Sequence, residues 1–407
     1  ELLTDTNSFY DMSASGIQAL LRIADGAAAL AVFEAACAYE KMAFFRGNKP
    51  LVDIEWKSRG LGMPLFNITR SALLKSLVEA VELLDQDVLC FETSAKLLDC
   101  EEGTVEISTP SSSEKQILHA DLVVASDGIH SRLRKQAFGD TGFRSDGVVA
   151  FYAVLPPLTP EEDKNLPRPD GMGDNFGVFG MEADFSQYAV VNKTGTIWYA
   201  NFILEEGKPY VSLPSNPKGW LEVARERCQS RSIPTVDALI ARTREENLQV
   251  VACCDREPLD SYSRGKLVLV GDAAHPFTPY AGLGASQAMV DTFCLAEALV
   301  DHQDEKDPSM AVKQYEEQRV KAANWLMNQS REICQSTFSY RVTCSILFGL
   351  FWIFNLFGKA EVICDTFMTL DYNSMVNDLV PFKNEKEKQS YQQQYDAALA
   401  SLRSQLS

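Results

Sequence analysis

Short runs of apolar residues, bounded by Gly, Pro and Asp, recur through the middle of this chain and are typical of β-strands. They lie at 151–155, 176–181, 188–191, 197–203 and 248–253. Together they predict a strand-rich middle region. The turn-rich segment 156–169 is expected to be a connection within this region rather than a flexible linker.

Helical and strand patterns occur on both sides of the middle region. An apolar stripe over residues 73–77 predicts a helix that begins near Arg70, and residues 305–335 predict another helix. Two short apolar runs, at 122–125 and 267–270, have the composition of buried parallel strands. Each is followed by a turn and a helix start, which is the organisation of an α/β fold.

The segment 267–291 carries the most specific chemical pattern. Asp272 follows its strand at the carboxyl end, where ligands of open α/β sheets bind. Gly282 and Gly284 allow the backbone to approach a flat ligand closely. The helix expected from about Ala285 would direct free N–H groups and the positive end of its dipole at that ligand. A carboxylate for sugar hydroxyls beside a helix start for an electron-rich ring indicates a flavin site.

The same segment resembles the second FAD-binding motif of single-component aromatic-ring monooxygenases. That group includes para-hydroxybenzoate and salicylate hydroxylases and the tetracycline-inactivating monooxygenases. The resemblance implies FAD contacts from the following loop residues: Gly271, Asp272, Pro279, Gly282, Leu283, Gly284, Ala285 and Ser286. Leu283 and Ser286 stand where the family often has Gln and Asn, so backbone contacts should persist while side-chain contacts differ. His275 is expected to shape the loop.

Two further matches support this resemblance. Asp127 and Gly128, after the strand-like run, resemble the family's Asp-Gly motif, which implies a place near the FAD pyrophosphate and a link to NAD(P)H. Ser131 is expected to cap the helix that follows, and its residues Arg132 and Arg134 lie either near the cofactor or on a solvated face. Arg70 resembles the Arg of the family's Arg-x-x-Leu helix start, which lies against FAD; the alternative is a surface Arg.

The beginning of the chain departs from the family pattern. The family starts with a βαβ unit whose Gly-x-Gly-x-x-Gly motif cradles the pyrophosphate, and this sequence has no such motif. Ser13-Ala-Ser-Gly-Ile-Gln18 resembles the stretch that follows that unit in relatives. The chain is therefore expected to begin after the unit, either as a fragment of a longer enzyme or as a truncated gene product.

The resemblance implies an α/β fold with a Rossmann-like FAD-binding domain of the para-hydroxybenzoate hydroxylase type, an inserted β-sheet substrate domain and a helical C-terminus. The first part of the FAD-binding domain, incomplete at its N-terminus, is expected over 1–150 and the second part over 256–335. The substrate domain is expected over 151–255 and the C-terminal helical region over 336–407.

The resemblance also implies an activity. FAD, reduced by NAD(P)H, would use O2 to hydroxylate an aromatic, phenolic or other lipophilic small molecule, as in secondary metabolism. The alternatives are an epoxidase, dehydrogenase or reductase of the same fold, and an inactive remnant unable to hold FAD. The sequence identifies no catalytic side chain. Candidates for the substrate pocket are large apolar residues of the middle strands: Phe176, Phe179, Met181, Tyr188, Trp198 and Phe202.

Composition limits the partners further. The net charge of −18 disfavours nucleic acid, because phosphate neutralisation needs a basic patch. Ten Cys without a CxxC pair or zinc spacing predict reduced thiols in the cytoplasm and no metal site.

The uncharged tract Val342–Gly358 is shorter than the roughly 20 residues of a membrane span. It predicts a helix packed on the protein; peripheral membrane contact and a true span are the alternatives.

Overall fold

The computed structural model describes most of the chain between residues 8 and 406. The residues outside the description are 1–7, 23–26, 40, 56–64, 85–87, 111–114, 183–184, 193–194, 204–212, 214–218, 230, 280–281, 335–381 and 407. The tract Val342–Gly358 therefore lies outside the described residues. Among the helices that are described, none has the length and apolar character needed to cross a membrane.

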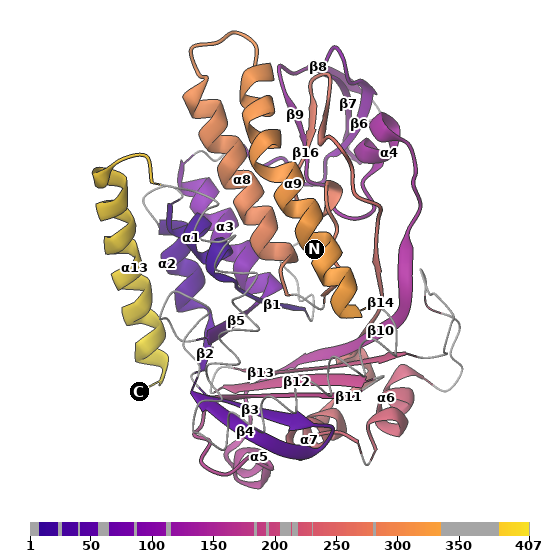
Figure 1. The fold of residues 1–407 in the computed structure, drawn as a ribbon, viewed down its shortest axis with the longest axis vertical. Coiled ribbons are helices and arrows are strands. Elements are labelled where there is room, and N and C mark those ends of the chain that lie inside the picture. The colour runs from indigo at the N-terminus through magenta and orange to yellow at the C-terminus, as the bar shows by residue number, and fades with distance from the viewer. Residues whose placement is uncertain are drawn as a thin grey trace.

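The strand-rich middle region forms most of a seven-stranded sheet, and all five predicted strands are confirmed (Figure 1). The sheet is antiparallel except where β11 pairs with β3. Its strands in spatial order are β14 (Gln249–Asp255), β10 (Arg144–Leu155), β13 (Gly195–Ile203), β12 (Phe185–Asn192), β11 (Phe176–Glu182), β3 (Lys41–Arg46) and β4 (Lys49–Glu55). The sheet thus also takes in two strands from near the start of the chain.

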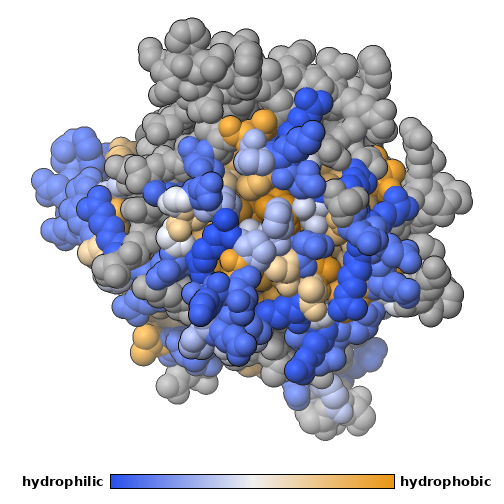
Figure 2. Space-filling view, turned by 90° about the horizontal axis from the view of Figure 1, so that it is seen from below, coloured by the Kyte–Doolittle hydropathy of each residue, from blue (hydrophilic) through white to orange (hydrophobic). Residues whose placement is uncertain are grey.

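One face of this sheet is the larger hydrophobic core. Side chains that alternate along its strands, such as Phe151 and Phe202, pack with buried residues of α6 (Trp220–Cys228) and α7 (Pro234–Arg242). Seen from below, the surface of this side is mainly hydrophilic, with hydrophobic residues visible in patches near its centre (Figure 2). The helix layer therefore shields one face of the sheet from water, and the other face is turned toward the rest of the molecule.

The rest of the molecule holds three small sheets and several helices (Figure 1). The first sheet has the order β1 (Phe9–Asp11), β5 (Leu65–Thr69), β2 (Cys37–Tyr39). The second has the order β15 (Ser263–Arg264), β16 (Leu267–Leu269), β9 (Val123–Ala125), and the third β6 (Ser94–Asp99), β7 (Thr104–Ser108), β8 (Gln116–His119). The predicted parallel arrangement of the two apolar runs is confirmed, since β16 and β9 pair in parallel.

Helix α5 (Pro160–Asn165) lies beside the large sheet, and the other helices surround the small sheets (Figure 1). Their bounds are α1 (Ala14–Arg22), α2 (Ala27–Glu34), α3 (Arg70–Leu84), α4 (Arg132–Phe138), α8 (Gly284–Asp301), α9 (Ser309–Cys334) and α13 (Glu385–Leu406). Helices α8 and α9 run side by side, and α13 returns to pack on α1, α2 and β2 (Figure 1). Arg22 of α1 pairs with Glu387 of α13, so the two ends of the described chain are joined by charge as well as by packing.

Candidate functional site

The loop between β16 and α8 is shaped by glycines. Gly271 has φ +57°, and a Cβ added there would lie 3.1 Å from the Cβ of Ala288. The turn after β16 therefore favours Gly for both its conformation and its packing. Helix α8 begins at Gly284, and its N-cap residue Leu283 makes no side-chain cap hydrogen bond. The first N–H groups of this long helix are thus left for a partner outside the helix.

The start of α8 lies beside the carboxylate at the end of β16. Among the described residues, a Cβ added at Gly284 would meet only Asp272 Oδ1 at 3.8 Å and Phe277 Cβ at 4.0 Å. The Asp272 side chain is exposed, yet enough protein surrounds it that desolvation raises the pKa of its carboxyl, against the opposing charge of His275. A ligand with hydroxyl donors would relieve this desolvation by hydrogen bonding to the ionised form.

The fully buried carboxylate of Asp291 fixes the loop between β16 and α8 from the protein interior. Asp291 of α8 accepts hydrogen bonds from Gly271 N at 2.8 Å and from Arg319 Nε at 2.6 Å, and it contacts His275 Nε2 at 2.5 Å. The side chains of Asp291, His275 and Arg319 are all 0% exposed. Burial alone would raise the pKa of Asp291, but His275 and Arg319 lower it to about 2. The carboxylate is therefore ionised and fixes the turn at Gly271, and the prediction that His275 shapes the loop is confirmed.

The same network reaches the start of α1. Arg319 Nη2 donates to Gln287 Oε1 at 2.7 Å, and Gln287 Nε2 donates to Ser15 Oγ at 3.3 Å. Ser286 Oγ accepts from Ser13 N at 3.0 Å. The hydroxyl of Ser286 thus binds the N-terminal segment within the protein. Only the backbone of Ser286 remains for a ligand over the loop.

The Asp-Gly turn lies after the neighbouring strand β9. Gly128 has φ +78°, and Asp127 Oδ2 accepts a hydrogen bond from Arg132 N at 2.9 Å. Ser131 Oγ accepts from Arg134 N at 2.9 Å, so the predicted cap of α4 is confirmed. Both polar side chains of the turn thus stabilise the start of α4, and the turn offers its backbone to a ligand.

Arg134 joins the Asp-Gly turn to the loop between β16 and α8. Its Nη1 donates to the carbonyl oxygens of Ala273 at 3.1 Å and Ala274 at 2.7 Å, and its Nη2 donates to Glu257 O at 2.8 Å. Arg134 is 1% exposed, so the alternative of a solvated face is wrong for this residue, whereas Arg132 is exposed. Burial, with the neighbouring charge of Arg256, lowers the pKa of Arg134 to about 10.

Arg70 is the first residue of α3, and it is half-buried near Tyr10 of β1. Burial raises the pKa of Tyr10; Arg70, which hydrogen-bonds Tyr10, acts against this, and the charge of Asp272 adds to it. Three groups from β1, α3 and the loop after β16 are thus brought together. The fold gathers Arg70 and Asp272, which are far apart in the sequence, around one tyrosine.

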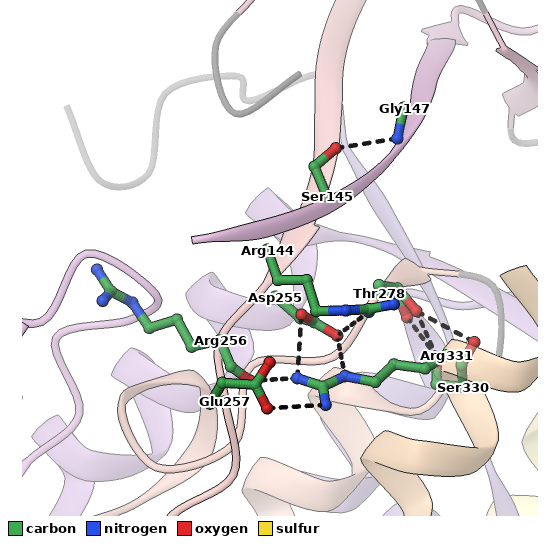
Figure 3. Close-up of polar contacts among 9 residues, drawn as sticks. All are labelled: Arg144, Ser145, Gly147, Asp255, Arg256, Glu257, Thr278, Ser330 and Arg331. Carbon is green, nitrogen blue, oxygen red and sulfur yellow. Dashed lines mark hydrogen bonds and ion pairs between the residues drawn. The ribbon is translucent and has the colours of Figure 1, made fainter. Parts of the chain in front are cut away.

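The end of α9 connects the loop to the large sheet (Figure 3). Arg331 contacts both oxygens of Asp255 at the end of β14, at 2.6 Å from Nε and 3.2 Å from Nη2. One residue earlier, Ser330 Oγ lies 2.6 Å from Thr278 Oγ1 in the loop. Because α9 holds both groups, it fixes the position of the loop relative to the strands that enter the sheet.

The six candidates for the substrate pocket divide between the two faces of the sheet. Phe176, Trp198 and Phe202 belong to the core beneath α6 and α7, and Trp198 Nε1 donates to Thr243 Oγ1 at 2.9 Å. Phe179 and Tyr188 are cross-strand partners on the opposite face. Met181 lies on β11, but its side chain is outside the description. Of the six candidates, the structure therefore places Phe179 and Tyr188 on the sheet face opposite α6 and α7.

Comparisons with known proteins agree with this geometry. The FAD binding domain family matches residues 220–330. HpxO of Klebsiella pneumoniae, solved with FAD and uric acid, superimposes with a TM-score of 0.65 over 98% of this chain and 89% of its own, at 18% identity. The chain has the fold of the FAD-dependent aromatic-ring monooxygenases. The expected FAD-binding architecture with an inserted sheet and a helical C-terminus is therefore confirmed.

Sequence relatives of this monooxygenase fold are hydroxylases. The 6-hydroxynicotinate 3-monooxygenase of Pseudomonas fluorescens is 33% identical over 183 residues, which are 44% of each chain. The 3-amino-4-hydroxybenzoate 2-monooxygenase PtmB3 of Streptomyces platensis is 27% identical over 278 residues, 67% of this chain and 63% of that protein. The matched region thus spans about half the length of these curated relatives.

The residues of the site fit FAD. Gly284, which carries no side chain, the exposed Asp272 and the uncapped start of α8 meet at one place, and this combination has the chemistry that a flavin nucleotide requires. Sequence reasoning missed the buried roles of Arg134, Arg319 and Asp291. Asp291 was signalled by a charge within the largely apolar sequence of α8, whereas Arg134 and Arg319 lie in charged helices, where nothing in the pattern distinguishes them.

Proposed function

We propose that the chain is part or all of a monooxygenase that uses FAD, NAD(P)H and O2 to hydroxylate an aromatic, phenolic or other lipophilic small molecule. One observation carries the proposal. The exposed Asp272 lies beside the uncapped start of α8 at Gly284, and the loop between them is held by the fully buried Asp291–Arg319 pair. Rigid support of this kind suits a site that must hold a ring in one orientation.

Bound FAD would supply the redox chemistry, with NAD(P)H as the hydride source and O2 as the oxygen donor. We assign the cofactor contacts to the residues expected above from the two motifs and from Arg70. Asp272 would accept hydrogen bonds from hydroxyl groups in the sugar-like part of FAD. The backbone N–H groups at the start of α8 would face the ring of bound FAD, where they favour negative charge. Arg70 and the Asp127–Gly128 turn complete the polar contacts.

The face of the large sheet opposite α6 and α7 would border the substrate. Phe179 and Tyr188 lie on this face, and Tyr152 and Tyr199 continue their row across neighbouring strands. Flat aromatic walls orient ring substrates and exclude water from them. The relatives named above act on hydroxypyridine and aminohydroxybenzoate rings, which supports a substrate of this size and chemistry.

We also propose the four-part domain division given by the sequence, with β3 and β4 added to the sheet domain.

A cytoplasmic location is supported by the cysteines, because those in the described residues are free thiols. The uncharged tract Val342–Gly358 supports a peripheral membrane contact, which would suit a lipophilic substrate.

Oxygen transfer tests the proposed activity directly. The FAD-loaded protein is mixed with NADPH or NADH and a panel of hydroxypyridines, aminophenols and larger phenols under isotopically labelled O2. We expect substrate-dependent consumption of O2 and one labelled oxygen atom in the product. Reduction or desaturation of the substrate without labelled oxygen would replace this proposal with another flavin chemistry on the same fold.

A further inference from the structure

Gly16 stands in helix α1 at a position where the backbone does not call for glycine. It is the third residue of α1, it is buried, and its φ is not positive. Glycine inside a helix costs about 0.5–1 kcal/mol relative to alanine, because it loses more conformational freedom on folding. The contacts of Gly16, rather than its conformation, therefore account for glycine at this position.

The contact that excludes a side chain at Gly16 is made by the first turn of α8. A Cβ added at Gly16 would lie 2.7 Å from both Cβ and Oγ of Ser286 and 2.8 Å from its Cα. Rotation of the Ser286 side chain cannot relieve this overlap, because Cβ and Cα do not move with it. Since carbon atoms pack best at about 3.5–4.0 Å, the two helices would have to separate by roughly 1 Å to admit the added carbon.

Hydrogen bonds join the two helices at the same place. Ser13 N donates to Ser286 Oγ at 3.0 Å, and Gln287 Nε2 donates to Ser15 Oγ at 3.3 Å. Ser13 Oγ and Ser15 Oγ lie 2.9 Å apart. These four residues are at most 3% exposed. The beginning of α1 and the first turn of α8 thus form one buried contact, and Gly16 lies within it.

The start of α8 has less support than the helix that it meets. Residues Ile17, Leu20 and Leu21 of α1 are buried in a core that includes residues of α2 and α13. The fully buried residues that α8 gives to its own core begin only at Val290, and its N-cap residue Leu283 makes no side-chain cap hydrogen bond. A forced separation would therefore displace mainly the first turn of α8.

This first turn is the part of α8 that we assign to FAD. Ser286 is the third residue of the helix, so its N–H is among those without an intrahelical partner. An N–H group bonds a ligand oxygen over a donor–acceptor distance of about 2.7–3.2 Å, so a shift of roughly 1 Å would break or weaken such bonds. A binding site of this kind must be held within about 0.5 Å.

We propose that Gly16 is a positioning residue for the flavin: because it has no side chain, α1 sets the place of the first turn of α8 and of the N–H groups that would face the ring. This inference rests on the proposed function. Gly16 acts on FAD only through Ser286. Alanine at this position favours the helix of α1 and yet weakens the FAD site.

Gly16→Ala adds the excluded carbon to the full chain, and Gly173→Ala is the matched control. Gly173 is exposed, its φ is not positive, and a Cβ added there would meet nothing within 4 Å among the described residues. Absorption titration gives the Kd for FAD. Anaerobic reduction beside a reference dye gives the ratio of the Kd values for oxidised and reduced FAD.

We expect Gly16→Ala to weaken FAD binding at least about tenfold, which corresponds to the loss of one or two hydrogen bonds. The preference for reduced over oxidised FAD should fall by about two- to fivefold, because the positive end of the α8 dipole moves away from the ring. General destabilisation would weaken the binding of both redox forms alike, so this ratio reports the placement of α8. Gly173→Ala should change neither value.

The double variant Gly16→Ala/Ser286→Gly removes two of the three close contacts, those with Cβ and Oγ of Ser286, and retains the contact with Cα. It should regain part of the FAD affinity that Gly16→Ala loses. If Gly16→Ala does not fold, comparison of the double variant with Ser286→Gly alone isolates the effect of the added carbon.

Hydrogen–deuterium exchange of the protein without FAD supplies a further measurement. The intrahelical bonds of α8 begin with Gln287 N, which donates to Leu283 O at 2.9 Å. In Gly16→Ala the amides of residues 287–291 should exchange faster, whereas those of the large sheet should exchange as in the unsubstituted chain.

Unchanged FAD affinity and redox preference in Gly16→Ala would overturn the inference. So would a loss that the double variant does not recover and that accompanies faster exchange throughout the sheets, since that is general destabilisation. Absence of FAD binding by the unsubstituted chain would instead count against the proposed function. Faster exchange confined to α8 in Gly16→Ala would then still support the role of Gly16 in placing this helix, and unchanged exchange would overturn it.

Discussion

Replacement of Arg319 with Met should destabilise the protein through the carboxylate that it leaves behind. Arg319 Nε and Asp291 Oδ1 are 2.6 Å apart, and both side chains are 0% exposed. Loss of one partner from such a pair costs about 3–5 kcal/mol when the remaining charge stays buried without compensation. His275 Nε2 at 2.5 Å and Gly271 N at 2.8 Å remain beside Asp291, so the loss should lie toward the lower end of this range. Met retains much of the apolar volume, so a cavity adds little to this cost.

Urea-induced unfolding measures this loss as a change in the free energy of unfolding. Lys313→Met is the matched control on the same helix: Lys313 lies 3.9 Å from Glu317, and these side chains are 67% and 69% exposed. Its removal should cost less than about 1 kcal/mol. The double variant Asp291→Asn/Arg319→Met removes both charges and should regain much of the lost stability. Equal losses in Arg319→Met and Lys313→Met would refute the reasoning.

Four other consequences can be measured on single variants or on the wild-type chain. The pKa of Asp291 is lowered from 3.8 to about 2, so its contribution to stability is complete above about pH 4 and is lost as the pH falls toward 2; urea midpoints across this range should show the loss. Arg134→Met leaves buried carbonyl oxygens without their donor and should cost about 1–3 kcal/mol, with a parallel loss of FAD affinity by absorption titration. Arg331→Met leaves Asp255 with its longer ion pair to Arg144, at 3.5 Å, and should lower the free energy of unfolding by about 1–3 kcal/mol, less than the loss for a fully uncompensated buried charge; an unchanged free energy would contradict the buried-pair argument. Trp198→Phe should destabilise the sheet core by about 0.5–3 kcal/mol, because it removes packing and the hydrogen bond to Thr243, and urea-induced unfolding measures the change.

Local patterns predicted the strands and the loop well. The runs that became β10 to β14, the parallel pair β9 and β16, and the start of α8 all depend on short-range alternation and on Gly or Pro at their ends. The motif around Asp272 was visible because its residues are consecutive. Its geometry could therefore be inferred without knowledge of the remaining fold.

Contacts between distant segments were not predictable in the same way. Strand β3 pairs with β11 across more than a hundred residues, and its sequence does not show which sheet it joins. The two-residue alternation separates Phe176 from Phe179, but it does not show which of them faces the loop. The contacts of Asp11 with Asn67 of β5 and Tyr188 of β12 were equally unpredictable, because only folding brings these three strands together.

The most direct test of the central claim is the visible absorption spectrum of the purified chain after saturation with FAD and removal of excess cofactor. It should be measured beside the protein with any residues that precede Glu1. We predict a bound-flavin spectrum, a marked loss of occupancy in Asp272→Ala, and full occupancy in Asp260→Asn. Absence of bound flavin from both lengths of the protein, or unchanged occupancy in Asp272→Ala, would contradict the account.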